Sequence, residues 1–296
     1  MKIGILELKN YQFILDVAAK LGDIGTEFIT AGEYDFSAEQ KYRVIIDRLS
    51  FQDPYLKQIM MMASINGAYV VNNPFSCSIN NKMLGQKVFE PFGVKQPKTF
   101  VLPRMSSDND IMPFLKEPEW ERIRAEMNFP CILKPFDGYA WDHVYQVGSF
   151  RELQNLYNAL KEKCIMLVQE KIEYEDYFRV FCVGKKDVLV CKWIPRPMGR
   201  GEFVKPDQKK LDGLEKPLSE LTIKINRVLD YDFNAVEWCS DPEGEIYMID
   251  AMNEVPDIIK GQMPDEYYWW LVEKFSALVR EKFHSHDKNP NTFCTQ

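Results

Sequence analysis

What this sequence of 296 residues lacks excludes several classes of protein. Its seven cysteines are odd in number and contain no Cys-x-x-Cys pair, which argues against a disulfide framework or a zinc site and favours reduced thiols. No apolar run approaches the roughly 20 residues that a membrane-spanning helix needs, and the first apolar run has no small-residue cleavage site after it. A net charge of −7 provides no general basic face for nucleic acid. We therefore expect a cytoplasmic protein whose partners include neither membrane nor nucleic acid.

The first hundred residues alternate between strand-like and helix-like segments. The apolar runs KIGILEL, TEFITA, YRVIIDRLS and AYVVNNP are interleaved with segments of helical spacing. This alternation predicts a parallel α/β layer. Ligands of such layers gather at the carboxyl ends of the strands, which here means Asp47, Arg48 and the turn Asn72-Asn73-Pro74.

The stretch PCILKPFDGYAWDHVYQV, residues 130–147, has the pattern of a phosphate site. Lys134 leaves an apolar run and is followed by Asp137-Gly138, so its ammonium could lie on a phosphate while backbone N–H groups hold the oxygens. The same residues are also typical of a surface lysine before an ordinary turn, so this segment alone decides nothing.

A second candidate site is the pair of strand-like segments FNAVEWC and EIYMIDAMNEVPD, joined by the turn SDPEG. A hairpin here would place Glu237 and Asp250 opposite each other, with Asn253 just beyond. Two carboxylates and an amide are the hard oxygen ligands that Mg²⁺ prefers beside nucleotide phosphates. The alternative is that one acid faces solvent and the other pairs with a lysine.

Two further groups of residues complete the set of candidates. The segment LVQEKIEYEDYF could act as a hinge whose backbone binds an adenine edge, with acids for the ribose hydroxyls; its candidate contacts are Gln169, Glu170, Lys171, Ile172, Glu175 and Asp176. A charged strand end is the alternative. Four basic residues could neutralise a triphosphate or a substrate carboxylate, unless they only cover solvated strand faces: Arg179, Lys192, Arg196 and Arg200.

The order of these elements along nearly the whole chain resembles the ATP-grasp superfamily, especially glutathione synthetase and the ribosomal-protein glutamate ligases. Lys82 and Lys134 are similar to the two phosphate lysines of that family, and the acids at 237 and 250 to its magnesium hairpin. The resemblance implies an α/β fold with an N-terminal layer (1–100), a central subdomain (101–168), a C-terminal subdomain (169–284) and a flexible tail (285–296). The nucleotide would lie between the sheets of the two later subdomains.

The resemblance also implies an activity. ATP, with Mg²⁺ or Mn²⁺, would phosphorylate a small amino-acid-like or peptide-like carboxylate, and an amine would attack the acylphosphate. No covalent enzyme nucleophile is needed, in agreement with the lack of a Ser-His-Asp or Cys-His arrangement. Two other functions stay open: a kinase acting on a polar small molecule, and an ATP-binding protein that has lost catalysis. A homo-oligomer also stays open, since the helix YYWWLVEKF is either core or a dimer face.

This chain departs from the family pattern in three places. Tyr139-Ala140-Trp141 stands where further glycines are expected, and the two hairpin acids occur as Glu then Asp. The spacing from Asp250 to Asn253 is one residue longer than the usual acid-x-Asn. Either a bulge brings Asn253 to the metal, or the second metal position is altered.

Overall fold

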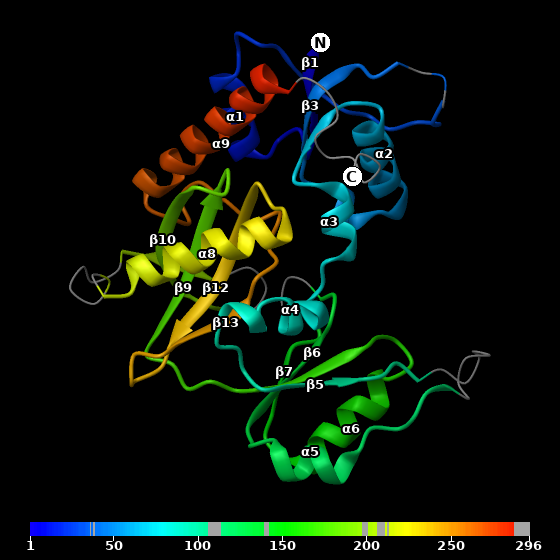
Figure 1. Ribbon diagram of the computed structural model, residues 1–296, viewed down its shortest axis with the longest axis vertical. Coiled ribbons are helices and arrows are strands. Elements are labelled where there is room, and N and C mark those ends of the chain that lie inside the picture. Colours follow the sequence, from blue (N-terminus) through cyan, green and yellow to red (C-terminus); the bar gives the residue numbers. More distant parts are fainter. Residues whose placement is uncertain are drawn as a thin grey trace.

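The computed structural model describes residues 1–35, 37, 39–105, 114–138, 142–196, 201–205, 211 and 213–286. Within these ranges the chain forms three sheets. Figure 1 shows them arranged along the long axis, with the N-terminal layer at one end and the sheet built from the middle of the sequence at the other. The predictions that concern Arg200 and Tyr139 to Trp141 lie outside the described residues.

The N-terminal sheet is parallel, as the alternating pattern predicts. Its strand order is β2-β1-β3-β4, and the strands are β1 (Lys2–Leu6), β2 (Thr26–Phe28), β3 (Tyr42–Asp47) and β4 (Tyr69–Val71). Helices α1 (Gln12–Lys20) and α2 (Pro54–Ile65) belong to this layer. The strands are nearly continuous apolar runs because helices cover both faces of the sheet.

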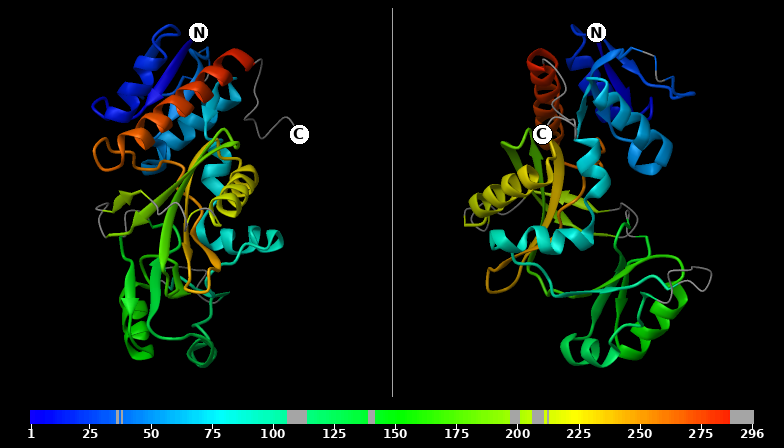
Figure 2. Two further views of the ribbon diagram at one scale, coloured as in Figure 1. Left: turned by 90° about the vertical axis from the view of Figure 1, so that its left-hand side faces the viewer. Right: turned by 45° about the vertical axis from the view of Figure 1, so that its right-hand side comes forward.

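The last helix, α9 (Asp265–Ser285), closes the N-terminal layer. It contacts α1, β3 and β4, as well as strand β9 (Asp176–Val183), and Figures 1 and 2 show it lying alongside α1. Phe275 of α9 stacks near Phe13 of α1 in a core that includes the first strands. The aromatic stretch of α9 is thus mainly core, although the Trp269 side chain remains exposed. None of the described helices has both the length and the apolarity that crossing a bilayer requires.

The central sheet is antiparallel, and its order is β5-β8-β6-β7. Its elements are β5 (Thr99–Leu102), α5 (Trp120–Glu126), β6 (Cys131–Pro135), β7 (Tyr145–Val147), α6 (Phe150–Leu160) and β8 (Met166–Glu170). The predicted subdomain boundaries at 100/101 and 168/169 fall inside β5 and β8, and both strands belong wholly to this sheet. The buried faces of α5 and α6 share one core with it.

The C-terminal sheet is also antiparallel, with the order β11-β10-β9-β12-β13. Besides β9, its strands are β10 (Asp187–Ile194), β11 (Glu202–Val204), β12 (Phe233–Ser240) and β13 (Ile246–Asp250). Helix α8 (Glu215–Leu229) covers one face, and the other face joins the core of the N-terminal layer and α9. The linking segment carries α3 (Pro74–Ile79) and α4 (Lys82–Val88), which lies where β6 and β13 approach each other (Figure 1).

Candidate nucleotide site

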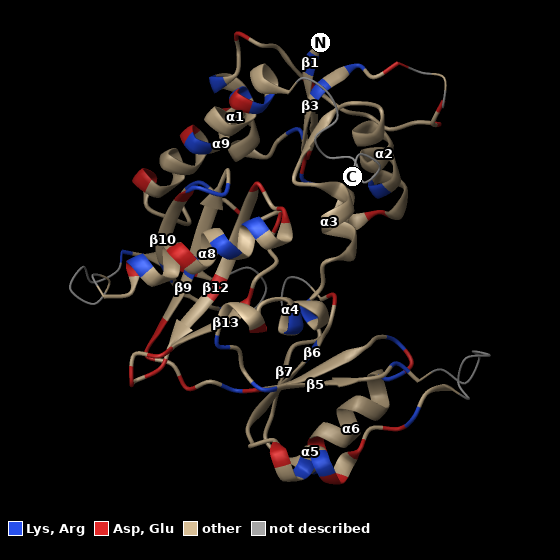
Figure 3. Cartoon of the chain, in the orientation of Figure 1, with Lys and Arg blue, Asp and Glu red and all other residues tan. Residues whose placement is uncertain are grey.

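Lys82 connects the central and C-terminal sheets. The Asn81 side chain caps α4 by accepting hydrogen bonds from Met83 N and Leu84 N, which makes Lys82 the first residue of the helix. The Lys82 ammonium lies 3.1 Å from Asp250 Oδ2 at the end of β13 and donates a 2.7 Å hydrogen bond to Gly138 O beyond β6. Figure 3 shows the basic residues of α4 at this junction. Burial opposes the charge on Lys82, but Asp250 and the other nearby acids outweigh it and raise its pKa.

Lys134 is the second cation of the site and is buried on β6. Its ammonium donates a 2.8 Å hydrogen bond to Gln169 Oε1, and Gln169 Nε2 in turn donates to Thr99 Oγ1 at 3.0 Å. Burial lowers the pKa of Lys134 to about 8; Lys82 adds to this effect and Asp250 opposes it. Since no ion pair joins Lys134 to any residue that the structure describes, its charge is available to an anionic ligand.

The two hairpin acids lie side by side. Glu237 on β12 is the direct register partner of Asp250 on β13, and Arg179 on β9 is the partner of Glu237 on its other side. Glu237 accepts a 2.7 Å hydrogen bond from the Tyr177 hydroxyl and lies 3.7 Å from Arg179 Nε. Burial would raise the pKa of Asp250, but Lys82 and Lys134 together hold it below its usual value. Asp250 is therefore an ionised carboxylate between two lysines.

Asn253 lies beside β12 one residue later than unbroken pairing from Asp250 would place it, and we call this extra residue the bulge after β13. The chain advances three residues from Asp250 to Asn253 while β12 advances two, from Glu237 to Ala235. Asn253 O accepts from Ala235 N at 3.2 Å, and Asn253 Nδ2 donates to Ala235 O at 2.9 Å. The buried Asn234 side chain holds the extra residue in place, since it donates to Ala251 O and accepts from Asn253 N, both at 2.8 Å. This leaves Asn253 Oδ1 facing Arg179 Nη2, 3.5 Å away.

The donors in this row suit a hard divalent cation, because they are two carboxylates and an amide oxygen. Within the described ranges, no group of three or more His, Cys, Asp or Glu residues could hold a metal ion. Glu237, Asp250 and Asn253 would therefore need oxygen atoms from a phosphate or from water to complete the coordination.

A pocket that is open to solvent lies among these residues. Its wall includes Lys82 and Gly85 of α4, Lys134 of β6, Gln169 of β8 and Asp250 of β13. Gly85 faces the methyl group of Met252, which lies just beyond β13 and also lines the pocket. Residues far apart in the sequence thus form one pocket that contains both lysines.

The predicted hinge runs between β8 of the central sheet and β9 of the C-terminal sheet. Glu170 N donates to Lys98 O at 2.8 Å, Lys171 pairs with Glu173 at 2.7 Å, and Ile172 packs partly buried against the main core. Asp137 is exposed. Gln169 contributes its side chain to Lys134, a role that the prediction of backbone contacts did not include.

The structure does not bring three of the predicted residues to this row. Asp176 and Lys192 form an ion pair with each other. Lys192 and Arg179 lie on opposite faces of the sheet. Lys192 shares its face with Val190, which packs against α8, and Arg179 shares the other face with its register partner Cys191. Arg196 pairs with Glu202 at 3.2 Å on the surface.

Glu254 adjoins the site and was not among the predicted residues. Burial raises the pKa of its carboxyl group; Asp250 adds to this effect, while Lys82 and Lys57 oppose it. Its place next to Asn253 in the segment MNEVPD was the only available signal.

Comparisons with known proteins bear on the fold. No family model matches the chain. It is 22% identical over 241 residues to the uncharacterized protein MG012 of Mycoplasma genitalium, a match that covers 80% of this chain and 83% of that protein. A RimK domain ATP-grasp protein from Sphaerobacter thermophilus is 14% identical with a TM-score of 0.66, covering 95% of this chain and 100% of the other.

Two ATP-grasp ligases of known structure are similar to the chain to the same degree. D-alanine–D-alanine ligase from Bacillus anthracis, complexed with ATP, is 13% identical with a TM-score of 0.65, and the match covers 97% of both chains. The ligase PsnB, complexed with a variant of its minimal precursor, Mg and ADP, is 13% identical with a TM-score of 0.63, covering 94% of this chain and 98% of PsnB. The chain has the ATP-grasp fold.

Proposed function

We propose that this protein is an ATP-dependent ligase that activates a carboxylate as an acylphosphate for attack by an amine. The observation that carries the proposal is the convergence of Lys82 and Lys134 on Asp250, in a pocket between the central and C-terminal sheets. A nucleoside triphosphate that transfers its terminal phosphoryl group needs cations to neutralise its phosphates and carboxylates that can hold a metal ion beside them. The similarity in fold to ligases solved with ATP, or with Mg and ADP, supports the proposal.

In this proposal each residue has a role that follows from its geometry. Lys82 and Lys134 would neutralise and orient the phosphates, while Glu237, Asp250 and Asn253 would hold Mg²⁺, which supplies further neutralisation of phosphate charge when bound. The segment 169–172 would receive the adenine. Arg179 Nε is buried without a hydrogen bond among the described residues, so it keeps a donor for the oxyanion that forms when the amine attacks the acylphosphate. The products are the amide, ADP and phosphate.

The first test is binding. Mg-ATP should raise the melting temperature of the wild-type protein, and Lys134→Ala should weaken ATP binding at least tenfold because it removes a buried cation from the phosphates. Lys163→Ala, which changes an exposed lysine near the same sheet, is the matched control and should bind ATP normally. Equal affinity in both variants would contradict the role given to Lys134.

The second test is turnover. ADP release should require both a carboxylate and an amine from a panel of such compounds, and mass spectrometry should detect the amide. ADP release with a stable phosphorylated product and no need for an amine would instead identify a kinase. Binding of ATP without turnover on any pair would identify a nucleotide-binding protein that has lost catalysis.

A further inference from the structure

Tyr177 of β9 contacts Glu237, one of the two acids that would hold the metal ion. Its side chain is buried, and its hydroxyl donates a 2.7 Å hydrogen bond to Glu237 Oε2. In the register of the sheet Glu237 lies opposite Arg179, two residues along β9 from Tyr177 and on the same face. Such a diagonal neighbour is within reach of a long aromatic side chain, which is why the hydroxyl can meet the carboxylate.

The Tyr177 hydroxyl is held in the protonated, donating form. Burial raises its pKa well above the usual value, and the charge of Glu237 adds to this effect. Among the described residues, Glu237 is the group to which this hydroxyl donates. One oxygen of the Glu237 carboxylate is therefore fixed by a buried hydrogen bond.

The second oxygen of Glu237 has no such partner. Oε1 lies 3.7 Å from Arg179 Nε, beyond hydrogen-bonding distance, and nothing else in the described part of the chain donates to it. Asp250 differs, because Met252 N donates to its Oδ1 at 3.2 Å and Lys82 lies 3.1 Å from its Oδ2. Of the four oxygens on these two acids, Glu237 Oε1 is thus the one left open.

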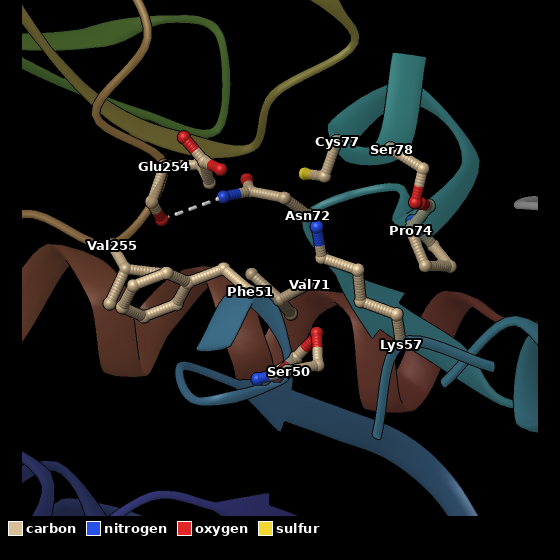
Figure 4. Close-up of a pocket in the computed structure, with 11 residues that line it drawn as sticks. Ser50, Phe51, Lys57, Val71, Asn72, Pro74, Cys77, Ser78, Glu254 and Val255 are labelled. Atoms are coloured by element: carbon tan, nitrogen blue, oxygen red, sulfur yellow. Dashed lines mark hydrogen bonds between the residues drawn. The ribbon is translucent and has the colours of Figure 1, made fainter. Parts of the chain in front are cut away.

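The nearby acid Glu254 does not take the place of Glu237. It lines a different pocket, together with Lys57 and Asn72, and Figure 4 shows its carboxylate among the residues of that pocket. Its carbonyl oxygen accepts a 2.9 Å hydrogen bond from Asn72 Nδ2, which holds this part of the backbone beside the end of β4. A cation beside Asp250 therefore depends on how the Glu237 carboxylate is oriented.

A carboxylate that offers a single oxygen suits Mg²⁺ better than Ca²⁺. Mg²⁺ is small and demands a near-octahedral set of ligands, whereas the larger Ca²⁺ takes more ligands and often both oxygens of a carboxylate. We propose that Tyr177 favours Mg²⁺ over Ca²⁺ at this site, because it holds Glu237 Oε2 and leaves only Oε1 for the metal ion. The inference rests on the proposed function, in which Glu237 and Asp250 hold the metal ion. Tyr177 acts through Glu237 and is a positioning residue.

Binding of metal–ADP complexes tests the proposal without turnover. Calorimetry compares Mg-ADP, Ca-ADP and ADP alone in EDTA, and wild-type protein should bind Mg-ADP more tightly than Ca-ADP. Tyr177→Phe should weaken Mg-ADP about tenfold, since it removes the hydrogen-bond partner of a metal ligand. It should weaken Ca-ADP less than about threefold, because Ca²⁺ can take the released oxygen. The affinity for ADP alone should not change.

Two controls separate this role from a structural one. Tyr174→Phe changes a neighbouring, exposed tyrosine whose ring packs edge-on against that of Tyr177, with the centroids 5.3 Å apart. It should leave all three affinities unchanged. In a Glu237→Gln background, Tyr177→Phe should not alter the ratio of Mg-ADP to Ca-ADP affinity any further, because its effect passes through the Glu237 carboxylate.

The inference and the proposed function can fail separately. Equal weakening of Mg-ADP and Ca-ADP in Tyr177→Phe, or no weakening of Mg-ADP, would overturn the role of Tyr177 and leave the nucleotide site in place. A wild-type protein with no preference for Mg-ADP over Ca-ADP would do the same, as would a change of the ratio that persists in the Glu237→Gln background. If ADP does not bind in any form, the proposed function fails and the inference falls with it.

Discussion

At the scale of single residues, Lys134 should make the proposed ATP binding depend on pH. Its pKa of about 8 is set mainly by burial, and bound phosphates would raise that value because they favour the charged form. Binding therefore takes up a proton once the pH exceeds about 8, and affinity should fall by at most about tenfold per pH unit above that point. Titrations with Mg-ATP between pH 7 and 9.5 measure the effect.

Lys134→Arg is the control for this profile, because a guanidinium stays charged throughout the range. Any ATP affinity that the variant retains should be independent of pH. The same decline above pH 8 in Lys134→Arg would mean that another group titrates, and that the pKa of Lys134 does not govern binding.

At the scale of elements, the bulge after β13 depends on one buried side chain. Asn234→Leu preserves volume but removes the hydrogen bonds to Ala251 O and from Asn253 N. Leaving one buried and one partly buried backbone group unpaired should cost about 2 to 4 kcal/mol in the free energy of unfolding, and the dependence of ATP affinity on Mg²⁺ should weaken because Asn253 loses its position. Denaturant titration and calorimetry with and without Mg²⁺ measure the two effects.

Asn226→Leu is a matched control, since Asn226 is also fully buried but donates only to Thr222 O within α8, and its Oδ1 has no partner among the described residues. It should cost less stability than Asn234→Leu and leave Mg-ATP binding unchanged. Equal losses of Mg-ATP affinity would show that general destabilisation, and not the bulge, is responsible.

The sequence predicted a contact in the site when both residues lay in one hairpin. It did not predict contacts that depend on the register between separate strands. The pairing of Glu237 with Asp250 followed from a short turn between two apolar runs. The placement of Asp176 and Arg179 on opposite faces of β9 was also available from the sequence, because residues three apart on a strand face opposite sides. Two other interactions depend on how separate strands align. One is the hydrogen bond from Lys134 to Gln169, and the other is the set of hydrogen bonds by which Asn234 holds the bulge after β13. No single segment encodes these contacts.

At the scale of the whole molecule, the N-terminal layer is joined to the C-terminal sheet through the core that they share with α9 and through polar contacts between them. The Tyr69 hydroxyl donates to Asp232 Oδ2 at 2.6 Å, and Arg48 Nη2 donates to Pro256 O at 2.9 Å, just beyond the loop that carries Glu254. Because α9 follows all three sheets in the sequence yet packs on α1, β3 and β4, the layer cannot be completed until α9 has been made. We therefore expect the N-terminal layer and the C-terminal sheet to unfold together.

Arg48 allows this coupling to be measured. Its side chain is 3% exposed and pairs with the side chain of Glu7, which is 6% exposed, with 3.0 Å between Arg48 Nε and Glu7 Oε2. Arg48→Met should lower the free energy of unfolding by about 3 to 5 kcal/mol, because it leaves the Glu7 carboxylate buried without its partner. Adding Glu7→Gln should recover part of this loss in denaturant titrations. If the losses of stability from Arg48→Met and Glu7→Gln simply add, the ion pair contributes nothing of its own.

The same variant tests the coupling between the layers. If the N-terminal layer melts in a separate transition in Arg48→Met, the contacts of Arg48 carry much of that coupling. A single cooperative transition would assign the coupling to α9.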